Sequence, residues 1–126
     1  DLLINNPDYN KYDKNGIYKK KCGLNNLHLS YGHDEYLYQV LIENKNKHLL
    51  SDKYLNIIRY HSFYPWHTEK DYHYFMNDND KKILNDVLLF NEFDLYSKED
   101  DTKITNDTKK YYFTILNEYF HDELQW

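Results

Sequence analysis

The spacing of the apolar residues constrains the fold of this 126-residue chain more than any other feature. In four segments, at 27–44, 51–64, 78–94 and 106–120, these residues recur every three or four positions, which places them on one face of an α-helix. No segment alternates apolar and polar residues over a convincing length, as a half-buried strand would. We therefore predict an all-α fold in which four helices surround one core.

The chain is interpreted as part of a single domain with two regions. Residues 1–26 hold a proline and two of the three glycines among polar residues, which predicts an irregular arm. Helices are predicted over 27–126. Pro65 disfavours the α conformation at the residue before it, so the second helix is expected to end near Tyr64.

Charge and cysteine content exclude several functional classes. A net charge of -5 with a single arginine, Arg59, argues against nucleic-acid binding, which needs a basic face to neutralise phosphates. No apolar run approaches the roughly 18 residues that a membrane span needs, so no membrane partner is expected. The lone cysteine, Cys22, rules out an internal disulfide and fits a reducing compartment, so we predict a cytoplasmic location.

Three residues that are able to bind a metal interrupt the apolar stripes: His33, His61 and Asp94. A buried carboxylate is costly unless it is paired or metal-bound, and helical bundles build metal sites from inward-facing side chains. Two histidines and one carboxylate suit non-haem iron, while zinc also accepts these ligands. The alternatives are hydrogen-bonded core histidines and a helix-end aspartate. Lys98, four residues after Asp94, is either a solvated lysine or a donor to a hydroxyl-rich ligand.

Three long strings in this sequence resemble signatures of the inositol oxygenase family. They are GHDEYLYQV at 32–40, RYHSFYPWH at 59–67 and FNEFDLYSK at 90–98, in the order and spacing of that family. Further similarity runs from NPD at 6–8 to LQW at 124–126, so the resemblance covers essentially the whole chain.

The resemblance implies a fold, an activity and a set of roles. The family has a distorted all-α, HD-domain-like fold, and it opens the ring of myo-inositol with O2 to give D-glucuronate, the first step of inositol catabolism. It uses a mixed-valent Fe(II)/Fe(III) pair and acts as a monomer when complete. By this resemblance His33 and His61 are ligands of the iron that chelates substrate, and Asp94 is a ligand of the other iron. Ser62 and Lys98 match residues that hydrogen-bond the substrate hydroxyls, and His61 is assigned to the substrate site as well as to the metal.

The same resemblance implies that the site is incomplete within these residues. The family takes six protein ligands to two Fe ions, and three of the six lie upstream of the part matched here. The chain therefore resembles the C-terminal half of an inositol oxygenase, and the 126 residues alone are expected to be inactive. The alternatives are a non-catalytic HD-like helical module and, with less support, an HD-type phosphohydrolase.

Overall fold

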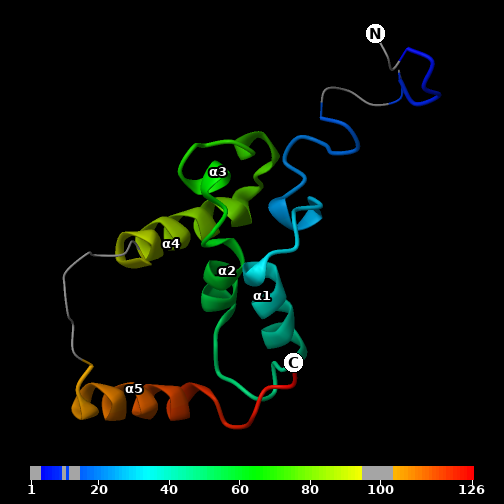
Figure 1. The fold of residues 1–126 in the computed structure, drawn as a ribbon. Helices are drawn as coiled ribbons and strands as arrows, with labels where there is room; N and C mark the ends of the chain where they lie inside the picture. Colours follow the sequence, from blue (N-terminus) through cyan, green and yellow to red (C-terminus); the bar gives the residue numbers. More distant parts are fainter. Residues whose placement is uncertain (1–3, 10, 12–14, 95–103) are drawn as a thin grey trace.

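The computed structural model describes residues 4–9, 11, 15–94 and 104–126, and its regular structure is helical (Figure 1). In this part of the chain the α-helices are α1 (His33–Glu43), α2 (Asp52–Tyr60), α3 (Tyr64–His67), α4 (Asp78–Asp94) and α5 (Asn106–Tyr119). Of two short 3₁₀ turns, η1 (Leu24–Asn26) precedes α1 and η2 (His73–Phe75) lies between α3 and α4. The predicted all-α class is confirmed, because the described residues form no strand, and the bridge between His48 and Phe120 is an isolated one.

Helix α1 begins at His33, six residues later than the apolar spacing predicts. Leu27, which closes η1, is already extended, and Gly32 occupies the N-cap position of α1 with extended backbone angles. Asp34 and Glu35 then place two carboxylates in the first turn, where the helix dipole favours negative charge. The helical spacing of residues 27–32 was therefore misleading, and Leu29 remains exposed.

Pro65 both follows one helix and starts another. Helix α2 ends at Tyr60, slightly before the expected position near Tyr64. A turn at 61–63 leads into α3, where proline lies in the first turn and its missing N–H costs nothing. This short helix was not predicted, and it places the fully buried Trp66 against the rings of Tyr60 and Phe63.

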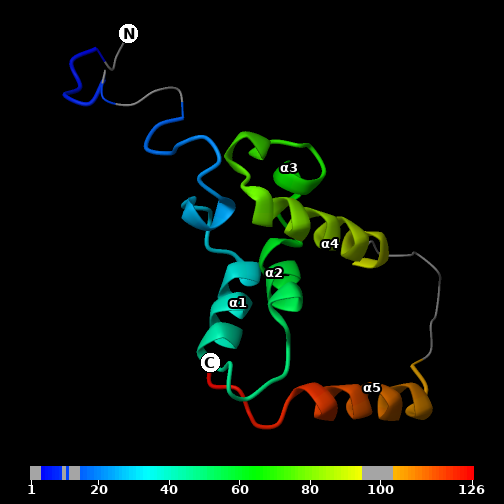
Figure 2. The same ribbon diagram turned by 180° about the vertical axis from the view of Figure 1, so that it is seen from behind.

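The core lies between α2, α3 and α4, and the arm contributes to it. Its buried members are Leu24, Ile57, Tyr60, Trp66, Met76, Ile83 and Val87. Helix α1 packs beside α2 in the opposite direction, so the start of α1 lies near the end of α2 (Figures 1 and 2). The arrangement brings together two helix ends that are distant in sequence.

A buried carboxylate joins the arm to the start of α4. Asp80, only 1% exposed, accepts hydrogen bonds from the backbone N–H of Leu24 at 3.1 Å and of Asn77 at 2.9 Å. Asn77 returns the interaction, because its side-chain oxygen accepts from the backbone N–H groups of Asn79 and Asp80. These bonds satisfy N–H groups that a helix start otherwise leaves unpaired.

Helix α5 does not pack around the common core, although all four predicted helices were expected to do so. It lies apart from α4, below the other helices, and has no buried residue (Figures 1 and 2). Its end is attached to the chain before α2 by hydrogen bonds from Leu49 N to Tyr119 O, 2.7 Å, and from His121 N to Lys47 O, 2.9 Å. The apolar stripe of α5 is therefore largely exposed.

Among the helices described, none combines the length and the apolar character that crossing a membrane requires.

Candidate metal centre and its pocket

His33 and His61 meet where the start of α1 approaches the end of α2. His33 is the first residue of α1, and His61 occupies the C-cap position of α2. Their Nε2 atoms are 3.3 Å apart, although 28 positions separate them in the sequence. The rings meet edge to face, with centroids 5.2 Å apart. Two imidazoles therefore direct their nitrogens toward one point at the surface of the helix pair.

This separation fits two ligands of one metal ion. Nitrogens that each lie about 2.1 Å from a metal and subtend about 90–110° at it are about 3.0–3.4 Å apart. The Nε2–Nε2 distance of 3.3 Å falls within that range. Imidazole nitrogen is a ligand for iron as well as for zinc, copper and nickel, so the donor type is compatible with iron without selecting it.

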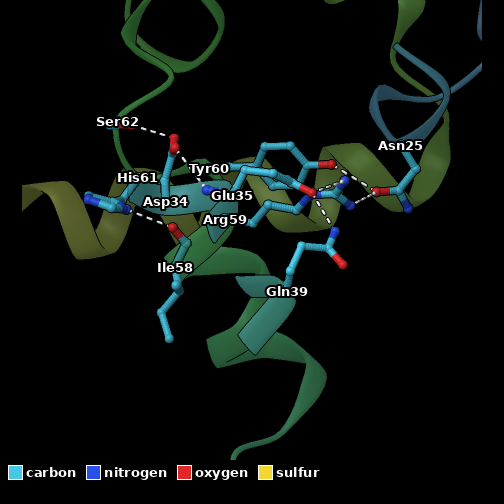
Figure 3. A network of polar contacts seen from close by, with 9 residues as sticks. All are labelled: Asn25, Asp34, Glu35, Gln39, Ile58, Arg59, Tyr60, His61 and Ser62. Carbon is cyan, nitrogen blue, oxygen red and sulfur yellow. Dashed lines mark hydrogen bonds and ion pairs between the residues drawn. The ribbon is translucent and has the colours of Figure 1, made fainter. Parts of the chain in front are cut away.

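Backbone contacts orient the His61 ring. Its Nδ1 lies 2.8 Å from the carbonyl oxygen of Ile58, which only accepts hydrogen bonds (Figure 3). In the neutral ring Nδ1 therefore carries the proton, and Nε2 presents its lone pair toward His33. From α3, the buried His67 places its Nε2 3.0 Å from the carbonyl oxygen of His61 itself. The backbone and the ring of His61 are both held.

Ser62 and Asp34 form a second link between the same helix ends. The Ser62 hydroxyl donates to Asp34 Oδ2 over 2.5 Å, and the backbone N–H of Glu35 donates to Asp34 Oδ1 (Figure 3). Partial burial opposes the charged carboxylate, but these hydrogen bonds outweigh it and hold the pKa of Asp34 below its usual value. Asp34 is therefore an anionic acceptor that orients Ser62.

A cavity of about 440 Å³ opens beside these residues. Its volume lies in the range typical of small-molecule sites. His33, Asp34 and Ser62 line it, together with the charged pair Glu35 and Arg59. Hydrogen-bond donors and acceptors, and charges of both signs, therefore line the space next to His33. Recognition of a polar molecule requires such groups.

The described residues do not group Asp94 with this histidine pair. Asp94 is the last residue of α4 and is exposed, which corresponds to the alternative of a helix-end aspartate, and His33 is exposed as well. Both are helix-end residues, where an apolar stripe no longer implies burial. Within the described ranges, no three His, Cys, Asp or Glu side chains form a group that would hold a metal ion. Lys98 lies outside the described residues.

The sequence did not predict that Glu35 of α1 and Arg59 of α2 form an ion pair beside the histidines. Arg59 donates to Glu35 Oε2 from Nε at 2.6 Å and to Oε1 from Nη2 at 3.1 Å, and its Nη1 reaches Asn25 in the arm (Figure 3). The phenol of Tyr60 donates to the same Asn25 oxygen at 2.9 Å. Burial raises the pKa of Tyr60 to about 12, so this phenol is a neutral donor. One signal existed: Arg59 is the only arginine beside 15 lysines.

These features define an all-helical protein in which two histidines converge beside a pocket that charged and hydroxyl side chains help to line. The whole chain, residues 1–126, matches the family described as Myo-inositol oxygenase. The chain belongs to this family, and its fold class is the HD-domain-like helical class of that family.

Curated relatives carry the same family name. An inositol oxygenase of Dictyostelium discoideum is 48% identical over 96% of this chain and 42% of its own length. Inositol oxygenase 2 of Arabidopsis thaliana is 46% identical over 98% of this chain and 38% of its own length. An inositol oxygenase of Danio rerio is 42% identical over 88% of this chain and 39% of its own length. The chain thus spans about two-fifths of the length of the relatives it matches.

Proposed function

We propose that the protein to which these residues belong is an inositol oxygenase that uses O2 to open the ring of myo-inositol, yielding D-glucuronate. The observation that carries the proposal is the convergence of His33 and His61 at 3.3 Å, beside a polar pocket, in a chain of this family. Two iron ions would supply Lewis acidity and the activation of O2. We place the protein in the cytoplasm as a monomer.

The proposal gives each site residue a defined task. His33 and His61 hold one iron, with the Nε2 lone pair of His61 directed by its Nδ1 contact to Ile58. Asp94 is assigned to the second iron through the family resemblance. The other three ligands belong to the family's upstream half.

Ser62 and Lys98 are assigned to the substrate. The Ser62 hydroxyl donates its hydrogen bond to Asp34, so its oxygen lone pairs remain able to accept a hydrogen bond from a hydroxyl group in the pocket. Lys98 would donate from its ammonium group to another hydroxyl. A cyclic polyol presents both donors and acceptors and matches this pair of partners.

Metal content and intact mass, measured on the same material, form the first test. About two irons per chain at a mass well above 15.6 kDa would support a complete di-iron centre, whereas substoichiometric metal at 15.6 kDa would identify half a site. In the longer protein, His61→Ala is expected to lower iron content and abolish ring cleavage. His121→Ala, an exposed histidine far from the pocket, is the matched control. Full iron and full turnover in His61→Ala would refute the assignment.

A second candidate applies to the 126 residues alone, namely a helical module without a working metal centre. The exposed apolar face of α5, which includes Tyr112, Phe113 and Leu116, favours this candidate. Such a surface promotes self-association. A monodisperse monomer at 15.6 kDa in analytical ultracentrifugation would argue against an uncovered interface, and oxygen consumption with myo-inositol would refute the candidate.

A further inference from the structure

We propose that the Glu35–Arg59 pair, anchored by Asn25, is a positioning device that sets the separation of His33 and His61. The proposal rests on the assignment of these histidines to a metal under Proposed function. Neither Glu35 nor Arg59 is a ligand in it, and each acts through a histidine two positions away.

The pair joins the two helix ends that carry the histidines. Glu35 lies two residues after His33 in the first turn of α1, and Arg59 lies two residues before His61 in the last turn of α2. The two parallel hydrogen bonds of 2.6 and 3.1 Å fix both the distance and the relative rotation of the helix ends. A shift of one helix along the other by one residue is about 1.5 Å, which would destroy the convergence of the imidazoles.

The surroundings of the pair hold it in one geometry. The side chains of Arg59 and Glu35 are only 18% and 21% exposed, and the guanidinium lies 4.4 Å from the ring centroid of Tyr38. Gln39 donates to Glu35 Oε1 at 2.6 Å, one turn further along α1. A partly buried, stacked and bidentate pair is far more rigid than an exposed ion pair, which often contributes nothing measurable.

Asn25 extends the device into the arm. Its side-chain oxygen accepts from Arg59 Nη1 at 2.5 Å and from the Tyr60 hydroxyl at 2.9 Å. Asn25 follows Leu24, which Asp80 ties to the start of α4. The end of α2 is therefore braced from α1 on one side and from the arm on the other, immediately before the chain reaches His61.

The functional consequence concerns the metal rather than the fold. A lysine at position 59 keeps the positive charge but loses the planar fork, so the helix ends remain paired without a fixed rotation. Removing a group that orients a ligand typically weakens metal binding about 10–100-fold. We therefore expect Arg59→Lys to weaken Fe(II) binding by at least about 10-fold while the apoprotein remains folded.

The chain provides a matched control in a second interhelical ion pair on the same helix. Lys53 of α2 lies 2.8 Å from Asp86 of α4, with side chains 50% and 32% exposed, at the end of α2 away from the histidines. Lys53→Gln removes an ion pair between helices without affecting the positioning of His61. Its effect on Fe(II) binding should remain within twofold of the wild type.

The experiment measures anaerobic Fe(II) binding by calorimetry, and apoprotein thermal unfolding, on the full-length protein. At least 10-fold weaker binding in Arg59→Lys and in Glu35→Gln, with Lys53→Gln unchanged, supports the proposal. Affinity within twofold of wild type in either site variant overturns it. If Arg59→Lys does not fold, Glu35→Gln, which keeps the side-chain size, decides alone. If the His61→Ala variant holds as much iron as the wild type, the proposed function is overturned instead.

Discussion

Gly23 provides a test of how the arm is attached to the helical core. Its φ of +90° with ψ of 143° lies in a region that essentially only glycine populates, and its N–H donates to Phe75 O at 2.8 Å. A Cβ at this position would lie 2.4 Å from Asn77 Nδ2 and 3.7 Å from Asp80 Oδ2. Because the Asn77 side chain already accepts two backbone N–H bonds at the start of α4, it is not free to move away.

The cost of Gly23→Ala follows from these two effects. The forced backbone conformation costs about 1–3 kcal/mol, and loss of the Asn77 cap costs about 1 kcal/mol. The expected loss in the free energy of unfolding is about 2–4 kcal/mol. With a urea dependence of about 2 kcal/mol/M, the unfolding midpoint falls by about 1–2 M.

Gly16→Ala is the matched control for this prediction. Gly16 also has a positive φ, +62°, but among the described residues, its chain neighbours apart, no heavy atom lies within 4 Å of the point that an alanine Cβ would occupy. Only the backbone penalty of about 1 kcal/mol applies there. Both variants would be compared by urea unfolding followed by far-UV circular dichroism. Equal midpoints for the two variants would show that the close approach to Asn77 does not hold the arm, and the reasoning would fail.

Three further predictions concern the core, the buried phenol and α5. Trp66→Ala should lower the free energy of unfolding by about 3–5 kcal/mol in urea unfolding, because Trp66 is 0% exposed. A loss below about 1 kcal/mol would contradict the placement of Trp66 in the core. Tyr60→Phe should cost about 1 kcal/mol at neutral pH through the lost bond to Asn25. The pKa of Tyr60 is raised from 10.0 to about 12, so above pH 10 the phenol ionises in the unfolded chain before it does in the folded protein. The free energy of unfolding of the wild type should therefore fall by about 2 kcal/mol as the pH rises from 10 to 12. The free energies of unfolding of the wild type and of Tyr60→Phe should therefore cross between pH 10 and pH 12. If the two curves of unfolding free energy against pH stay parallel, the raised pKa of Tyr60 is refuted. In the 126-residue chain alone, Leu116→Glu, at a half-exposed position, should reduce self-association in sedimentation and change the free energy of unfolding by less than about 0.5 kcal/mol; unchanged association would exclude this face as the contact.

The helical class and the bounds of α4 and α5 followed from the sequence because they depend on local spacing. Helix α4 was predicted from the acidic start at Asp78, and α5 from the stripe that ends at Phe120. Helix α3 was missed because a proline both stops and starts helices, and only the burial of Trp66 distinguishes the two outcomes. The start of α1 was placed too early because Leu29 fits the stripe without being buried.

The site was only partly predictable, for a physical reason. The proximity of His33 and His61 depends on two antiparallel helix ends meeting, and their stripes identified both residues without giving that proximity. The pairing of Glu35 with Arg59 depends on side-chain reach across 24 positions, which no local pattern encodes. The roles of Asp94 and Lys98 stay predictions from the family resemblance.

The end of the chain has a consequence for the order of folding. Asn44, buried at the end of α1, donates from Nδ2 to Gln125 O and accepts from Gln125 N, each at 2.8 Å. Closing a loop of 81 residues costs about 4 kcal/mol in chain entropy, more than two such hydrogen bonds return. These bonds therefore form stably only after the intervening helices have shortened the path.

The two tryptophans report separately on these stages. Trp66 is enclosed by the core, whereas Trp126 is 77% exposed and stacks on Tyr36 of α1 with ring centroids 6.3 Å apart. Core formation changes the surroundings of the first indole, and docking of the chain end changes those of the second. In stopped-flow refolding, the difference between the wild-type and Trp126→Phe traces gives the Trp126 signal, which should lag behind the signal of Trp66, so that collapse of the core and closure of the long loop can be timed separately.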